Sequence, residues 1–230
     1  MSHRGPHPAD RALFAAEAVP VLREAVADLS WLRGRGYSDE AALALVGNRF
    51  QLKERARMAA SRAAASDAAV GSRAAKRVQL DGLAGRALSI DGFNVLVTSE
   101  AALAGGVIVR GRDGALRDLS SVHGTYRRVD ETEAVIAAVA QLIADASPSS
   151  VRWLLDRPVS NSGRVAAMLR AAAPAWQVEL VDAPDPALAA AGGVIATADS
   201  WILDRALAWI DLPAALIAAR APDAWLIDLM

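Results

Sequence analysis

The chain has 230 residues with a formal net charge of −1, and 53% of its residues are hydrophobic. This length suits one large domain, or one domain with a small appendage, around a substantial core. The absence of cysteine excludes disulfides, thiolate metal sites and a cysteine nucleophile. No apolar run reaches the roughly 18 residues of a membrane span, and the N-terminus does not resemble a signal peptide. We therefore expect a cytoplasmic protein with no membrane partner.

The charge is unevenly distributed along the chain. Residues 1–80 contain 13 Lys and Arg against 8 Asp and Glu, whereas residues 81–230 contain 12 against 18. Only Lys53 and Lys76 are lysines, and so strong an arginine bias in an alanine-rich chain is consistent with genome composition. We therefore interpret the asymmetry between the two parts and not any single arginine.

The first 80 residues predict a small helical module. Apolar residues of segment 22–32 recur on one helical face, and this helix should end at Gly34 or Gly36. Ser38 is placed to cap a second helix, which should stop at Gly47.

A third helix is predicted over residues 52–64, and residues 65–85 resemble a linker or a loose helical extension. The basic residues in and just before the third helix are candidates for binding a nucleic-acid backbone. A solvated amphipathic helix is the alternative. The candidates are Arg49, Lys53, Arg55, Arg57 and Arg62.

From residue 87 onward, predicted strands alternate with predicted helices. A β-hairpin is expected over residues 107–119, with its turn near Asp113-Gly114. The alternation predicts an α/β fold with a mainly parallel sheet flanked by helices, and two domains, 1–80 and 81–230. The core strands are expected at residues 87–90, 151–156, 176–181 and 193–197. Helices are expected at residues 131–146, after a cap at Ser160 or Asn161, and through Trp201 to Leu207. The tail should add a last strand at the edge of the sheet.

Three predicted strands end at or near an aspartate. Asp91 closes the first strand, Asp156 closes the second, and Asp199 lies two residues beyond the fourth. The carboxyl ends of parallel strands lie at one sheet edge, so these acids should come together there. Because clustered carboxylates repel one another, Mg²⁺ or Mn²⁺ would be their natural partner. The alternative is that each acid separately caps a helix, forms a turn or pairs with an arginine.

The acidic motifs resemble those of the PIN/NYN-like nuclease superfamily. The segments are IDGFN (90–94), LLDRPVSNSGR (154–164) and ATADSWILD (196–204), and the first is the most characteristic. The hairpin between the first two acids departs from a compact PIN domain. Segment WLRGRGYSDEAALALVGNRF (31–50) resembles the helical half of an uncharacterised two-part family in which such a unit precedes this kind of α/β domain.

This resemblance implies metal ligation by Asp91, Asp156 and Asp199, with Asn94 orienting water or substrate and Asp204 as a fourth acid. It implies metal-dependent hydrolysis of phosphodiesters by an activated water, of RNA rather than DNA. Two alternatives stay open: an inactive scaffold that binds nucleic acid or protein, and a small-molecule phosphohydrolase. A homo-oligomer is also left open.

Several further residues are secondary candidates. Glu100 could reach the metal edge or be a solvated helical acid, and Ser160 could bind phosphate or only cap a helix. His123 could donate a proton to a leaving oxygen, with Arg127 and Arg128 nearby for nucleic acid, although a polar surface loop is the favoured interpretation. The six tryptophans are expected to pack in the core and at its edges rather than to stack on bases.

Overall fold

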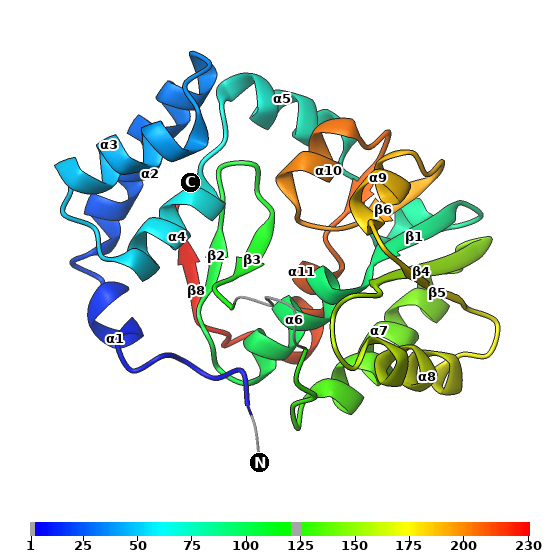
Figure 1. The fold of residues 1–230 in the computed structure, drawn as a ribbon. Coiled ribbons are helices and arrows are strands. Elements are labelled where there is room, and N and C mark those ends of the chain that lie inside the picture. The colour runs from blue at the N-terminus through cyan, green and yellow to red at the C-terminus, as the bar shows by residue number, and fades with distance from the viewer. Residues whose placement is uncertain (1–2, 121–125) are drawn as a thin grey trace.

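The computed structural model describes residues 3–120 and 126–230. Figure 1 shows the N-terminal helices on one side of a small sheet and a larger α/β body on the other. In the described residues no helix combines the length and the apolar character needed to cross a bilayer. The N-terminal elements are α1 (Asp10–Leu13), α2 (Val19–Gly34), α3 (Asp39–Arg49), α4 (Glu54–Ala63), α5 (Asp67–Lys76) and the 3₁₀ turn η1 (Leu80–Leu83).

The helical prediction is confirmed for this region, with two corrections. Ser38 accepts a hydrogen bond from the backbone N–H of Ala41 and caps α3 as expected. Gly47, however, does not end α3. The guanidinium of Arg57 packs directly over this residue, where a Cβ would lie 2.2 Å from Nη1, so the missing side chain serves packing inside the helix.

Residues 65–85 are not a linker. Ser66 accepts from the backbone N–H of Ala69 and starts α5, which is followed by η1. Alanine, serine and glycine in this segment suggested weak order. The segment is ordered because α5 packs against α2 and α10, and Arg73 of α5 is buried in an ion-pair cluster.

The main sheet has five parallel strands in the order β5-β4-β1-β6-β7. All four predicted core strands are present, and the tail supplies β7 at the edge. The strands are β1 (Ala87–Asp91), β4 (Ser150–Asp156), β5 (Gln177–Val181), β6 (Val194–Ala196) and β7 (Trp209–Ile210). The connecting helices are α6 (Gly92–Leu103), α7 (Thr132–Ala146), α8 (Ser162–Ala172), α9 (Pro184–Ala189), α10 (Ser200–Arg205) and α11 (Leu212–Arg220).

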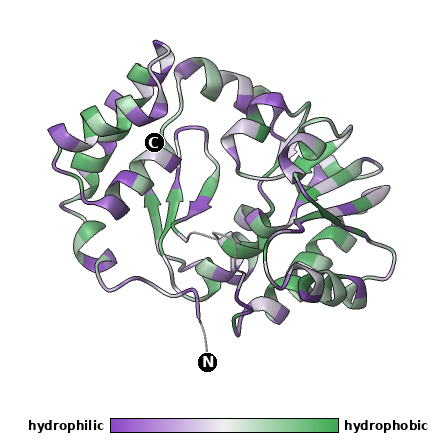
Figure 2. Ribbon diagram, in the orientation of Figure 1, coloured by the Kyte–Doolittle hydropathy of each residue, from purple (hydrophilic) through white to green (hydrophobic). Residues whose placement is uncertain are grey.

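Alternate side chains of these strands enter two separate apolar clusters, as the pleat requires. Leu88, Ile90 and Trp153 belong to the larger cluster, which includes α6, α7, α8 and α11. Leu154 and Ile195 point the other way, into a smaller cluster with α9 and α10. Figure 2 shows the hydrophobic colouring concentrated on the strands and the inward faces of the helices. The α/β prediction is therefore confirmed.

The predicted hairpin is also confirmed, but it belongs to a second sheet. Strands β2 (Ile108–Arg110) and β3 (Leu116–Asp118) pair antiparallel, and Gly114 in their turn has a φ of +76°. Strand β8 (Leu226–Asp228) joins β2 in parallel. The N-terminal helices cover this sheet, because their apolar side chains share one cluster with Val109 and Ile227. The N-terminal helices, the hairpin and the C-terminal strand β8 thus share one apolar cluster. The division into domains 1–80 and 81–230 stays a prediction.

Candidate functional site

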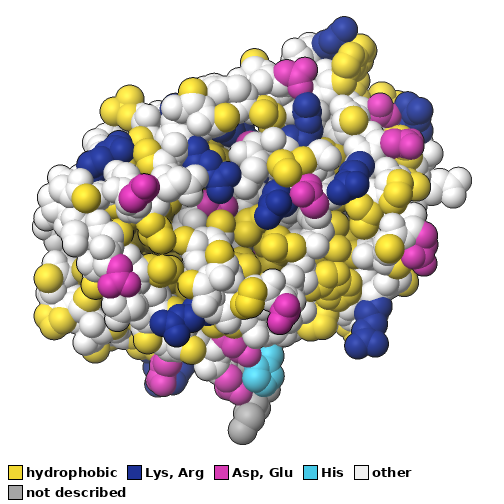
Figure 3. Space-filling model, turned by 180° about the vertical axis from the view of Figure 1, so that it is seen from behind, with side chains coloured by type: hydrophobic (Ala, Val, Ile, Leu, Met, Phe, Trp, Pro, Cys, Tyr) yellow, Lys and Arg dark blue, Asp and Glu magenta, His cyan; other side chains and the backbone are white. Residues whose placement is uncertain are grey.

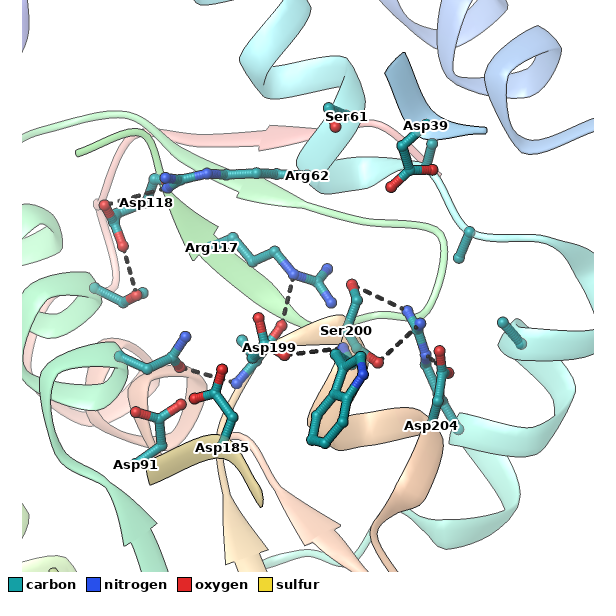
Figure 4. Close-up of a pocket in the computed structure, with 18 of the residues that line it drawn as sticks. Asp39, Ser61, Arg62, Asp91, Arg117, Asp118, Asp185, Asp199, Ser200 and Asp204 are labelled. Atoms are coloured by element: carbon teal, nitrogen blue, oxygen red, sulfur yellow. Dashed lines mark hydrogen bonds and ion pairs between the residues drawn. The ribbon is translucent and has the colours of Figure 1, made fainter. Parts of the chain in front are cut away.

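Each strand of the main sheet has an aspartate at its carboxyl end, either as its last residue or within four residues after it. In sheet order these are Asp185, Asp156, Asp91, Asp199 and Asp211. The first four line one pocket of about 740 Å³, which opens between this sheet edge and helices α4 and α5. The fifth is buried elsewhere: it caps α11 and accepts from the backbone N–H of Leu116 in β3. Figure 4 shows Asp91, Asp185 and Asp199 gathered on the same side of the pocket.

The Asp91-Gly92 pair makes the tight passage from β1 into α6. A Cβ at Gly92 would lie 2.9 Å from the backbone oxygen of Leu154 and 2.4 Å from a methyl group of Leu155, both in β4. Only glycine lets the chain turn so close to the neighbouring strand. Asp91 consequently ends its strand at the pocket and not within the core.

A hydrogen-bonded bridge joins the ends of β1 and β6. The hydroxyl of Thr197 donates to Oδ2 of Asp91 at 2.8 Å and accepts from the backbone N–H of Asp199 at 3.0 Å. Asn94, in the first turn of α6, accepts from the backbone N–H of Ala198 at 2.9 Å. These contacts fix two of the carboxylates relative to each other.

Burial, and then the charge of neighbouring carboxylates, raises the pKa of three aspartates of the pocket. Burial is the main cause that raises the pKa of Asp91 to about 7, and the charges of Asp199 and Asp185 add to it against the Thr197 hydrogen bond. Burial, followed by the charge of Asp185, raises the pKa of Asp156. Burial and the charge of Asp199 likewise raise the pKa of Asp185. The four acids therefore form one electrostatic cluster with excess negative charge.

Arginines line the rest of the pocket, but internal partners take up their donors. Arg117 donates to both oxygens of Asp113 and to the backbone oxygen of Ala198. Arg73 binds Asp113 and Asp204. Arg33 donates mainly to the backbone oxygens of Ser61 and Ala64. Arg62 donates mainly to the backbone oxygens of Asp118 and Ser120. These guanidinium groups hold the pocket walls together and do not neutralise the four-aspartate cluster.

The oxygen-only donor set suits a hard divalent cation in kind. Within residues 3–120 and 126–230, no three Asp, Glu or His side chains are arranged closely enough to hold one ion. The fit therefore rests on donor chemistry and on the gathering of four aspartates in one pocket.

Six residues predicted from the sequence meet in this pocket: Arg62, Asp91, Asn94, Asp156, Asp199 and Asp204. Asp199 also caps α10 by accepting from two backbone N–H groups. The alternative interpretation of this acid as a helix cap is therefore correct, although Asp199 also lines the pocket. Asp204 forms an ion pair with Arg73 at 2.7 Å. Arg73 therefore offsets the charge of Asp204, whereas neither Asp91 nor Asp199 forms an ion pair with the described residues.

Other predicted residues lie elsewhere. Glu100 is neither at the pocket nor solvated: it is fully buried in α6, where it binds Arg4, Tyr126 and Thr132. Ser160 is exposed and does not line the pocket, and the side chain of Asn161 donates to the backbone oxygen of Tyr126 instead of capping α8. His123 lies outside the described residues.

The predicted basic side chains mostly have intramolecular partners. Arg55 pairs with Asp10, Arg49 with Asp28 and Arg128 with Glu133. Arg57 binds Asn48 and two backbone oxygens, whereas Lys53 is exposed at the start of α4, and Arg127 is exposed. On the face seen in Figure 3, basic side chains are scattered among acidic and hydrophobic ones. Nucleic-acid binding by these residues stays a prediction.

Two residues of this site, Asp185 and Thr197, were not predicted from the sequence. Asp185 lies in the Pro-Asp-Pro segment four residues after β5, and the rule used for Asp199, an acid just past a strand, would have selected Asp182 instead, which directly follows β5 but does not line the pocket. Thr197 carries no charge and gives no comparable signal. Its role depends on the adjacency of β1 and β6, which are distant in sequence.

Comparisons with known proteins identify relatives but no function. Residues 80–215 match the family described as domain of unknown function DUF5616, and residues 21–76 match the one described as protein of unknown function DUF434. An uncharacterized protein of Methanocaldococcus jannaschii is 30% identical over 158 residues, which cover 69% of this chain and 76% of that protein. No solved structure matches.

Proposed function

The chain belongs to the family described as domain of unknown function DUF5616, and we propose that it hydrolyses phosphodiester bonds of nucleic acid, RNA in preference to DNA, with a divalent metal ion. The observation that carries this proposal is the convergence of Asp91, Asp156, Asp185 and Asp199 on one pocket. The resemblance of the IDGFN and ATADSWILD segments to PIN/NYN-like nucleases supports it.

Asp91, Asp156, Asp185 and Asp199 would supply the oxygen ligands, with their side chains drawn closer together than in the described residues, where no three are near enough to hold one ion. A bound Mg²⁺ or Mn²⁺ would lower the pKa of a water molecule and offset the charge that develops on the phosphoryl oxygens. Thr197 positions Asp91 against Asp199, and Asn94 ties α6 to the backbone beyond β6. No side chain in this arrangement need form a covalent intermediate.

The test is cleavage of end-labelled single-stranded RNA and DNA with Mg²⁺, Mn²⁺ or a chelator. We expect cleavage only with metal, faster on RNA, and a loss of at least about 100-fold in Asp91→Asn. Asp182→Asn is the matched control, because Asp182 lies at the same sheet edge but is exposed, pairs with Arg157 and does not line the pocket. It should cleave like the wild type.

The alternatives give different outcomes. Metal-dependent release of phosphate from a generic phosphomonoester, without cleavage of either polymer, would favour a small-molecule phosphohydrolase. Binding of RNA with no cleavage under any metal would favour a scaffold. Equal cleavage by the wild type and Asp91→Asn would refute the proposed site.

A further inference from the structure

Two exposed aromatic side chains line the same pocket as the aspartates. Trp201 of α10 is 43% exposed, and Tyr37, in the connection from α2 to α3, is 53% exposed. The expectation that all tryptophans pack in the core or at its edges is therefore wrong for Trp201, and also for Trp31, which is 55% exposed outside the pocket. Large aromatic surfaces left in solvent beside a polar pocket are candidates for ligand contact.

Trp201 lies beside the aspartate cluster. Its backbone N–H donates to Oδ1 of Asp199 at 2.9 Å. The guanidinium of Arg205 lies 3.9 Å from the centre of the indole ring and also donates to the backbone oxygen of Trp201. One face of the ring is thus covered by a cation, and the residue still keeps 43% of its surface exposed. The indole ring therefore presents a planar surface to the pocket.

Tyr37 approaches the pocket from the other part of the chain. It lies two residues before Asp39, which Figure 4 shows, with Ser61, on the side of the pocket away from Asp91, Asp185 and Asp199. The two aromatic side chains therefore come from the two walls between which a polymer would have to lie.

The charges of the pocket decide what kind of contact can hold that polymer. The four aspartates repel phosphate, and the arginines of the walls already donate to internal partners. Affinity from neutralising phosphates should consequently be small here. Stacking of bases on aromatic rings does not depend on net charge and is available only where bases are unpaired.

From these observations we propose that Trp201 and Tyr37 stack on bases of single-stranded nucleic acid and select it over duplex. This inference rests on the proposed function for the location of the scissile bond, but the stacking itself needs neither metal nor cleavage. Duplex is excluded because its base faces are already stacked and cannot reach either ring.

Binding is measured by fluorescence anisotropy on the full chain in a chelator, so that metal-dependent cleavage is absent. The probes are a labelled single-stranded oligonucleotide of about ten residues, an abasic strand of equal length, and the matching duplex. We expect the single strand to bind best, and Trp201→Leu and Tyr37→Leu each to weaken its binding about 5- to 100-fold. Binding of the abasic strand should be weak and equal in all variants.

Trp31→Leu is the matched control. Trp31 is also exposed and also lies under an arginine, Arg35, 3.6 Å from its ring centre, but it does not line the pocket. It should bind like the wild type. Melting temperatures close to that of the wild type will show that the variants are folded. If Trp201→Leu does not fold, Tyr37→Leu alone decides the result.

The proposal is overturned if both pocket variants bind like Trp31→Leu, if the abasic strand binds as tightly as the normal one, or if the single strand does not bind at all. Its failure is separate from that of the nuclease. Base-dependent binding without cleavage under any metal would support the stacking proposal and contradict the proposed hydrolysis. Metal-dependent cleavage that neither aromatic substitution affects would support the proposed hydrolysis and contradict the stacking proposal.

Discussion

The hydroxyl of Thr197 donates a 2.8 Å hydrogen bond to Asp91 and thereby connects the ends of two adjacent strands, β6 and β1. Thr197 is fully buried and also accepts from the backbone N–H of Asp199. One neutral side chain therefore satisfies a carboxylate and a backbone donor at the floor of the pocket.

Thr197→Val should lower the free energy of unfolding by about 1–2 kcal/mol. Valine has the shape of threonine but leaves the N–H of Asp199 and one oxygen of Asp91 without this partner. Thr197→Ser restores the hydroxyl and should recover most of the loss. Urea denaturation at neutral pH measures both variants. A serine variant as unstable as the valine one would show that the methyl group, and not the hydrogen bond, matters.

Mn²⁺ should raise the melting temperature of the wild type by about 5 to 10 °C at a concentration about 100-fold above its Kd. Metal binding to the folded chain would relieve repulsion among the four aspartates. Asp91→Asn should reduce that shift, and Asp182→Asn, the exposed control, should keep it. Calorimetry with and without Mn²⁺ gives the answer, and equal shifts in all three proteins would exclude a metal site at Asp91.

Without metal, Asp91→Asn should be more stable than the wild type at about pH 8. Burial raises the folded-state pKa of Asp91 to about 7, above its ordinary value of 3.8, so the ionised group destabilises the fold. Stability from this residue is present at low pH and is lost as the pH rises toward and through 7. The asparagine variant does not ionise, so its advantage should disappear near pH 4. An advantage independent of pH would point to another cause.

Asp113 should make the fold sensitive to acid. Asp113 is buried between Arg73 and Arg117, and its pKa is lowered to about 2. Burial alone would raise this pKa, but the hydrogen bond and charge of Arg117, followed by the hydrogen bond and charge of Arg73, outweigh the effect of burial. Because the unfolded value is near 3.8, about 2 kcal/mol of stability is present above pH 4 and is lost as the pH falls toward 2.

Asp113→Asn should remove this part of the acid dependence and should itself cost about 3 kcal/mol at neutral pH, since it leaves Arg117 without a buried counter-charge. The matched control is Glu179→Gln, which breaks the half-exposed pair with Arg152 and should cost less than about 1 kcal/mol. Denaturation curves between about pH 2 and pH 7 compare them. Parallel losses in the wild type and Asp113→Asn would contradict the assignment.

The sequence predicted the parallel sheet, the hairpin and most N-terminal helices, because these follow from patterns within a few residues. The same alternation of strand and acid identified Asp91, Asp156 and Asp199. It failed for Glu100, whose burial depends on Arg4, 96 residues away, and on Tyr126. It failed also for segment 65–85, where packing of α5 against α2 and α10 outweighs weak local propensity.

Local sequence thus determined which elements form and where their acids fall, since periodicity, capping and turn chemistry act between near neighbours along the chain. Only the tertiary structure decided which of those acids share a pocket: the order β5-β4-β1-β6-β7 brings Asp185, Asp156, Asp91 and Asp199 together, whereas Asp211 is buried under the hairpin. It also decided that most of the basic side chains pair internally while Trp201 and Tyr37 stay in solvent. Burial and partner choice depend on contacts between distant segments, which no local pattern contains.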